Sequence, residues 1–186
     1  VTGIDFGNTT HKSAAGTDLA FDGKDDFVQV PDSATLKPAR VTVEAHVKFD
    51  SLDSPNALAP GLQYIVFKKN TRSGNFEGYA LIKLRVDGVD RLGFGISSAT
   101  GVPAITYSTT AVQAGKWYHV AGTYDGAIAR IYVDGALEGT TPHVYPLDYD
   151  TRPIFLGTSG ESYFDGKLQG QLDEVRIWSV ARTEAE

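Results

Sequence analysis

The segment from Trp117 to Gly139 constrains the fold more than any other part of the chain. It holds two runs rich in aromatic and β-branched residues. Asp125-Gly126 joins these runs, and the second one ends at Asp134-Gly135. Asp and Gly tolerate positive φ, so an Asp-Gly step between two such runs favours a β-hairpin. The segment therefore predicts a meander of antiparallel strands.

Period-2 alternation of apolar and polar residues predicts further strands. The clearest case runs from Thr42 to Phe49, where valines, an alanine and a phenylalanine share one face and polar residues share the other. Such a pattern means that one face is buried. No helical period of 3.6 persists over ten residues, so we expect an all-β antiparallel sandwich or barrel. The expected strands are 19–21, 27–31, 42–49, 64–67, 78–86, 91–97, 105–109, 117–124, 128–133, 154–157 and 166–178.

Composition narrows the class of protein. A chain of 186 residues is most simply one domain, here 1–186, since β-sandwiches of this size fold as one unit. The net charge of −6 argues against nucleic-acid binding, which uses a basic stripe. With no cysteine, the chain has no disulfide framework, thiolate metal site or cysteine nucleophile. No apolar run approaches the roughly 20 residues that span a bilayer. The first residue is not Met, and we expect a domain taken from a longer protein.

Three sequence motifs, in this order along the chain, resemble the laminin-G-like domains of the concanavalin A-like lectin/glucanase superfamily. They are LAFDGKDDFVQVPD at 19–32, VTVEAHVK at 41–48, and the 117–139 meander together with GQLDEVRIW at 170–178. The resemblance implies a jelly-roll β-sandwich of two curved antiparallel sheets. It also implies that Trp117 and Trp178 pack inside the core. One departure is visible, because the family often has Trp where this chain has His46.

The resemblance also implies a structural calcium ion. Asp22, Asp25, Asp26 and Asp173 are carboxylates at turns or strand ends, and Ca²⁺ prefers such oxygens together with turn carbonyls. In a jelly roll the first and last strands lie side by side, so Asp22 and Asp173 are expected to meet. We predict Asp22, Asp173 and the carbonyl of Lys24 as ligands. The alternative is that Asp22 only forms a turn and that Asp173 pairs with an arginine.

The sequence does not favour an enzyme. Retaining glycoside hydrolysis needs two carboxyl groups about 5 Å apart, and no strand has the Glu-x-Asp-x-x-Glu pattern that glucanases of the superfamily use. Asp173 and Glu174 are adjacent and are expected on opposite faces of a strand, whereas Glu174 and Arg176 form an ion pair. There is no Gly-x-Ser-x-Gly elbow, and His119 is interpreted as structural.

Carbohydrate binding is the function that the sequence favours. The predicted sugar contacts are His46, Arg85, Tyr107 and Tyr163, with the alternative that the tyrosines only cap the core. We expect a non-catalytic, lectin-like accessory domain with a structural calcium ion, whose partner is a glycan or polysaccharide. It would belong to a secreted or cell-surface protein. The alternative is a protein-interaction or adhesion module that uses loops 50–62 and 142–153.

Overall fold

The computed structural model describes a molecule built almost wholly of β-strands. It covers residues 5–7, 10–13, 17–54, 59–70, 73–74, 76–98, 100–161 and 165–186. In this part of the chain the helical structure is a single 3-10 turn, η1 (Ala34–Leu36). None of the described residues forms a helix long and apolar enough to span a membrane.

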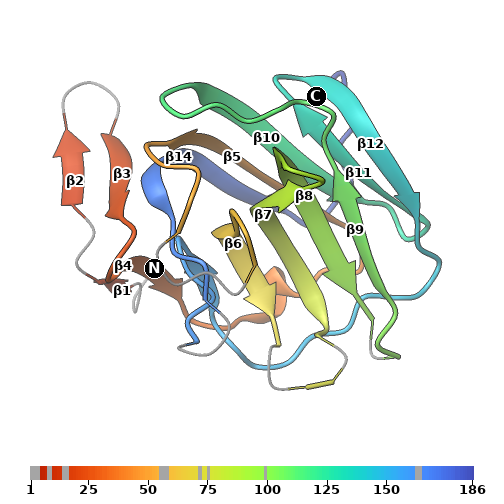
Figure 1. The fold of residues 1–186 in the computed structure, drawn as a ribbon. Helices are drawn as coiled ribbons and strands as arrows, with labels where there is room; N and C mark the ends of the chain where they lie inside the picture. Colours follow the sequence, from red (N-terminus) through yellow and green to blue (C-terminus); the bar gives the residue numbers. More distant parts are fainter. Residues whose placement is uncertain are drawn as a thin grey trace.

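Two seven-stranded sheets pack face to face, and every strand pairing is antiparallel (Figure 1). The predicted all-β jelly-roll sandwich is therefore confirmed. The first sheet has the order β1 (Asp5–Gly7), β4 (Asp26–Val30), β13 (Ile154–Leu156), β6 (Gln63–Lys69), β7 (Gly78–Val86), β8 (Val89–Ser97), β9 (Pro103–Tyr107). The second sheet has the order β12 (Ala136–Pro142), β11 (Ile128–Val133), β10 (Trp117–Tyr124), β5 (Val41–Phe49), β14 (Gln169–Trp178), β3 (Thr17–Asp22), β2 (Thr10–Ser13).

The Asp-Gly steps form the predicted turns. Asp134-Gly135 joins β11 to β12, and both residues have positive φ, 50° and 84°. This pair of values is typical of the type I′ turn, whose twist matches that of a hairpin. Between β10 and β11, Gly126 has φ of 99°, and the Asp125 carboxylate accepts the backbone N–H groups of Ala127 and Ile128. The meander that opened the sequence argument is therefore present.

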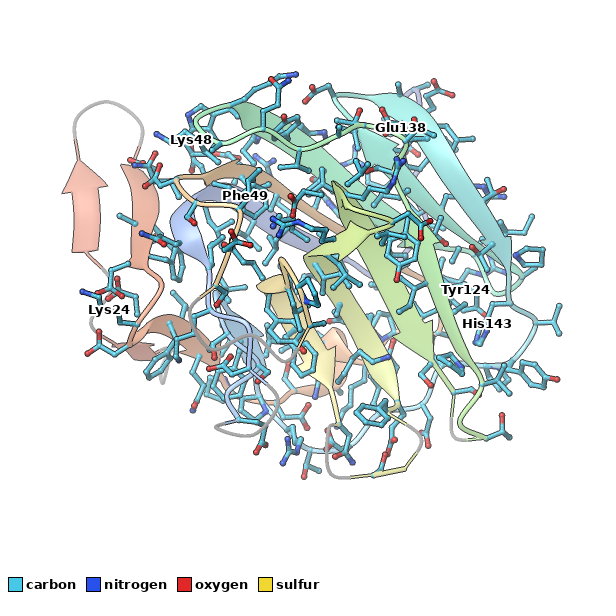
Figure 2. The ribbon with its side chains drawn as sticks, viewed as in Figure 1. Lys24, Lys48, Phe49, Tyr124, Glu138 and His143 are labelled. Atoms are coloured by element: carbon cyan, nitrogen blue, oxygen red, sulfur yellow. The ribbon has the colours of Figure 1, made fainter. Side chains whose placement is uncertain are left out.

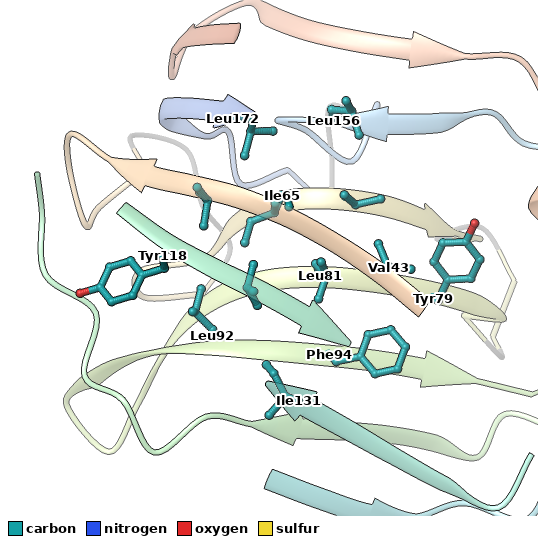
Figure 3. Packing of buried hydrophobic residues seen from close by; sticks show 14 of the residues in the cluster. Val43, Ile65, Tyr79, Leu81, Leu92, Phe94, Tyr118, Ile131, Leu156 and Leu172 are labelled. Carbon is teal, nitrogen blue, oxygen red and sulfur yellow. The ribbon is translucent and has the colours of Figure 1, made fainter. Parts of the chain in front are cut away.

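The core lies between the two sheets. The apolar face of β5 is fully buried, with Val41, Val43 and Val47 each at 0% exposure. Figure 3 shows residues of β5, β10, β11 and β14 in the second sheet pointing toward residues of β6, β7 and β8 in the first. The labelled members of this cluster are Val43, Ile65, Tyr79, Leu81, Leu92, Phe94, Tyr118, Ile131, Leu156 and Leu172.

Two strands were not among those predicted, and one expectation about packing was wrong. Residues 5–7 and 10–13 form β1 and β2; each strand pairs along the edge of one sheet, with β4 and β3 respectively. Trp117 and Trp178 are 39% and 37% exposed rather than in the core. Their strand positions oppose Lys48 and Thr42 on the outward side of β5, so the register turns both indoles away from the other sheet.

The two sheets approach each other closely at Gly122 of β10. A Cβ atom at this position would lie 2.2 Å from the ring of Phe94 on the opposite sheet. Real Cβ atoms do not approach a ring carbon so closely, so a larger residue would have to displace Phe94, which is itself fully buried. Gly122 therefore sets the distance between the sheets at this point.

A histidine is buried at the end of the sandwich where Tyr124 also lies (Figure 2). The His143 side chain lies between Tyr124 and Tyr145, with ring centroids 5.7 Å from each. It is 3% exposed, and its Nε2 has no hydrogen-bond partner. Burial, with a smaller contribution from the positive charge of Lys69, lowers the pKa of His143. The folded protein therefore holds this imidazole neutral in a range where the unfolded chain protonates it.

We expect Gly122→Ala to lower the free energy of unfolding by about 1–3 kcal/mol, the usual cost of overpacking a filled core. The matched control is Gly95→Ala on β8, where a Cβ would meet only Ile105 at 3.8 Å. Urea denaturation of the two variants measures the difference. Equal stabilities would contradict the close approach at Gly122.

We expect stability to fall as the pH drops below about 6.5, because the unfolded chain then binds a proton that folded His143 does not. His143→Phe removes this titration and should flatten the dependence of unfolding free energy on pH between about 5 and 7. Denaturation curves across that range provide the measurement. A variant that keeps the wild-type slope would show that His143 is not responsible.

Candidate functional site

The outer face of the first sheet, which points away from the core, carries a second apolar cluster. Leu62, Tyr64, Phe67, Ala80 and Ile82 are each less than 9% exposed and lie on β6, on β7 or just before β6. Alternation along β7 explains this, because Leu81 faces the main core while its neighbours face outward. Apolar residues therefore gather on a sheet face that no other layer of the described chain covers.

Small residues lie in the middle of this face and large ones at its sides. Strand register places Phe155 opposite Phe67, which is opposite Ala80. The row continues through Gly95 to Ile105. Because a Cβ built on Gly95 has Ile105 as its nearest contact, at 3.8 Å, the space above Gly95 is open. The outer face of the first sheet is consequently hollowed over β7 and β8.

The hollow over these small residues is apolar and has a volume of about 400 Å³. Its lining includes Tyr64, Phe76, Ile82, Gly95 and Ile105. Lys69 also lines it. Burial lowers the pKa of Lys69 to about 8, an effect that the nearby Glu77 carboxylate partly opposes. This hollow thus combines aromatic and aliphatic walls with one amine.

A second, more polar hollow of about 530 Å³ lies over β4 and β13 on the same face. Phe27 and Phe155 line it, with an edge-to-face contact at 6.4 Å between ring centroids. Gln29 stands opposite Phe155 on the neighbouring strand and also lines the hollow. Phe155 also packs against the apolar cluster, several of whose members line the first hollow, so both hollows lie on the same sheet face.

Fixed charges surround the polar hollow. Asp165 Oδ1 accepts the hydroxyl hydrogen of Thr158 at 2.7 Å, and its Oδ2 lies 3.0 Å from Lys167 Nζ. Glu161 forms an ion pair with Arg152. Asp165, Lys167 and Glu161 line the hollow. Their partners hold these groups in position, so the hollow presents oriented hydrogen-bond acceptors and a cation beside two aromatic rings.

The four predicted sugar-contact residues lie in different places. Tyr107 is on the hollowed face, where its ring packs over Gly93 on the neighbouring strand. Arg85 is held by Asp90 and Asp53 in ion pairs of 2.9 and 3.0 Å. His46 is on the outer face of the second sheet, and Tyr163 lies outside the described residues. Of the three that are described, only Tyr107 is on this face.

The sequence analysis missed Phe27, Gln29 and Phe155, although a signal was present. Phe155 stands between the buried Ile154 and Leu156, so alternation alone turns it outward. Phe27 and Gln29 likewise flank buried Val28. An outward aromatic residue on a short strand was the feature that distinguished this face.

A separate cluster of carboxylates lies at the turn between β3 and β4, where Figure 2 labels Lys24. Asp22, Asp25 and Asp26 each place an oxygen within 4.8 Å of the others. Asp22 Oδ1 accepts the N–H groups of Lys24 and Asp25, and Asp26 Oδ2 accepts the N–H of Asp22. Burial, together with the negative charges of Asp22 and Asp25, raises the pKa of Asp26. These oxygen donors fit the chemistry of a hard divalent cation such as Ca²⁺.

Asp173 does not join this cluster. β3 and β14 are neighbours, as expected, but Asp22 stands opposite Gln169, and Asp173 lies four residues further along β14. At about 3.3 Å per residue this separates the two positions by roughly 13 Å. Asp173 instead stands opposite His46. The expected side-by-side placement of Asp22 and Asp173 was therefore wrong. Two strands can be neighbours in a sheet while two given residues on them lie far apart, because the register decides which residues stand opposite each other.

The carboxylates of the second sheet have partners of their own. Glu174 and Arg176 form the predicted ion pair. Glu44 Oε1 accepts the indole N–H of Trp178 at 3.0 Å and lies 3.8 Å from an Arg176 nitrogen. Its other oxygen is 3.5 Å from His119 Nε2. Glu44 is thus the centre of a network that ties β5, β10 and β14 together on their outer face.

Comparison with known proteins identifies the family. A sequence model of the concanavalin A-like lectin/glucanases superfamily matches residues 22–186, and the chain belongs to this superfamily. Pappalysin-1 of Mus musculus and of Homo sapiens are each 31% identical to it over 77 residues, 39% of this chain. The chain spans about 5% of the mouse protein and 4% of the human protein.

Solved structures share the fold at low sequence identity. Domain 4 of AbnA, an extracellular arabinanase from Geobacillus stearothermophilus, was solved with arabinotriose; it is 17% identical, has a TM-score of 0.70 and matches over 96% of this chain and 79% of that one. A Bacteroides ovatus protein described as carbohydrate-binding is 21% identical, has a TM-score of 0.68 and matches over 94% of this chain and 46% of that one. The binding domain of botulinum neurotoxin DC, solved with SialylT, is 12% identical, has a TM-score of 0.71 and matches over 98% of this chain and 44% of that one.

Proposed function

We propose that this chain is a non-catalytic carbohydrate-binding module. Its ligand, a glycan or polysaccharide, would lie on the outer face of the first sheet. The observation that carries the proposal is the pair of hollows on that face, one apolar and one lined by aromatic rings and oriented polar groups. Binding would require no bond to form or break.

The chemistry of the two hollows matches that of a sugar chain. A pyranose or furanose presents an apolar face of C–H groups and a rim of hydroxyl groups. Aromatic rings such as Phe27 and Phe155 would pack against the former. The oxygens of Asp165 and Gln29 would accept hydrogen bonds from the latter, as the few polar groups in a mostly apolar pocket usually do.

The related structures support this proposal. One is an arabinanase domain that was solved with arabinotriose and is matched over 79% of its length, so a related sandwich is found with a carbohydrate ligand. The toxin binding domain was solved with SialylT and is matched over 44% of its length. The arabinanase is extracellular, and in both cases the related domain is part of a larger protein. We infer that this chain likewise works outside the cell or on its surface, as one module of a larger protein.

A protein-interaction module is the second candidate. The segment after β12 exposes apolar side chains, with Val144 72% and Tyr145 43% exposed. This segment is within loop 142–153, one of the two loops that the sequence analysis assigned to a partner. A partner protein that covers these two residues would explain their exposure.

We further propose that Asp22, Asp25 and Asp26 hold a structural calcium ion, with the Lys24 carbonyl as a further ligand. Three carboxylates near one another repel, and the pKa of Asp26 is raised by burial first and by this repulsion second. A divalent cation would relieve it. When bound, calcium would fix the turn between β3 and β4, which leads directly into the strand that carries Phe27.

We expect Asp26→Asn to stabilise the protein in chelator at neutral pH. A carboxyl with a raised pKa binds its proton more tightly when folded, so ionised Asp26 opposes folding as the pH rises above its ordinary 3.8. In calcium the order should reverse, since the wild type gains about 2.7 kcal/mol at a hundred times the dissociation constant. Asp173→Asn is the control and should keep the full calcium response. Thermal melting of the wild type and the two variants, with and without calcium, provides the measurement. A wild-type melting temperature that does not change with calcium would contradict the proposal.

For the carbohydrate proposal we expect hits on a glycan array, followed by titration calorimetry with the sugars found. Gly95→Val fills the apolar hollow, and Phe155→Ala removes a ring that lines the polar hollow. Each should weaken binding roughly tenfold or more, about 1.4 kcal/mol. Trp117→Ala removes an exposed ring from the second sheet and should leave affinity unchanged.

The outcomes separate the candidates. Loss of binding in Trp117→Ala alone would move the site to the second sheet. An empty array, with the domain folded and calcium present, would contradict the carbohydrate proposal and favour the protein-interaction module. In that case a charged substitution at Tyr145 should disrupt binding to the partner protein.

A further inference from the structure

The outer face of the second sheet carries two imidazoles side by side. His46 on β5 stands directly opposite His119 on β10. Their ring centroids are 4.9 Å apart, and the rings are tilted by 44°. Both side chains are half-buried, so solvent reaches them. The carbohydrate proposal uses neither residue.

Two carboxylates adjoin this pair. On the other side of His46, Asp173 of β14 is its direct opposite. Residues directly opposite in an antiparallel pair have Cβ atoms about 4.5–5.5 Å apart. Glu44, one row along, places its Oε2 3.5 Å from His119 Nε2. Three neighbouring strands therefore place two imidazoles and two carboxylates on one surface patch. As the side chains stand, no three of their ligand atoms lie within 4.8 Å of one another, so an ion would draw them together by side-chain rotation.

We propose that His46, His119, Glu44 and Asp173 form a binding site for a transition-metal ion such as Zn²⁺ or Cu²⁺. An ion about 2.0–2.1 Å from one nitrogen of each imidazole, at a near-tetrahedral angle, would set the two ring centroids about 5 Å apart. The observed separation is 4.9 Å. Imidazole with carboxylate suits zinc and copper, whereas the aspartates of the β3–β4 turn offer only the oxygens that suit calcium.

The surrounding contacts orient the carboxylates before an ion arrives. Trp178 Nε1 donates to Glu44 Oε1 at 3.0 Å, and guanidinium nitrogens of Arg176 and Arg182 lie 3.8 and 4.0 Å from the same oxygen. Glu44 Oε2 is thereby left toward His119. Asp173 Oδ1 accepts the N–H of Glu174 at 2.8 Å. Partners of this kind fix the ligands of metal sites, although two nearby guanidiniums also reduce the attraction for a cation.

The test is calorimetric titration of the untagged, chelator-treated chain with Zn²⁺, in calcium that saturates the aspartate cluster. We expect one zinc ion per chain. His46→Gln and His119→Gln should each weaken binding by at least about tenfold, since even outer partners of metal ligands are worth 10–100-fold. His11→Gln, on β2, is the matched control and should bind as the wild type does. Melting curves without zinc verify that each variant is folded.

A second readout identifies the donors. With Cu²⁺ as the probe, electron paramagnetic resonance should show coupling to two imidazole nitrogens in the wild type and to one in each single variant. Equal zinc affinity in the wild type, His46→Gln and His119→Gln would overturn the proposal, as would the absence of zinc binding. Neither result depends on whether the first sheet binds a sugar.

Discussion

Burial of one face of each central strand against the opposite sheet is the constraint on which the rest of this structure depends. The inward residues of β5, Val41 to Phe49, are at 0% exposure, and Gly122 lets Phe94 approach within contact distance. Because the side-chain period of a strand is two, fixing the inward set also fixes the outward set. Both proposed binding surfaces consist of these outward residues.

The two outward faces have opposite chemistry, and that difference separates their roles. On the first sheet, small residues over β7 and β8 leave open space beside aromatic rings. On the second sheet, outward positions hold Glu44, His46 and His119 in a connected network of ionisable groups. A sugar chain needs a hollow with an apolar floor, and a transition metal needs clustered nitrogen and oxygen donors. The single sandwich can present both without conflict because its core separates the two faces.

Local patterns in the sequence were enough to predict most of the strands. Alternation identified β5, and the Asp-Gly steps identified the turns after β10 and β11. The edge strands β1 and β2 could not be predicted, since they contain no run of alternating residues and depend on pairing with β4 and β3. The candidate site was harder to predict than the strands, because it depends on which residues of neighbouring strands stand opposite each other. Tyr107 was predicted to contact sugar and lies on the hollowed face, but the hollow itself depends on small residues of two other strands, Ala80 and Gly95, lying opposite each other.

The bulge in β14 shows how much the proposed metal site depends on one register shift. Asp173 stands opposite His46 and Arg176 opposite Glu44, so three steps along β14 match two along β5. After the extra residue, the side chains that would have faced outward face inward, and those that would have faced inward face outward. Without it, Val175 would face Glu44 on the outer surface and Arg176 would point into the core. The extra residue costs strain, since Glu174 adopts φ of 51°, a left-handed value unfavourable for residues other than glycine. In return Val175 and Ile177 reach the core, while Arg176 and Trp178 reach Glu44 and position it beside the two histidines.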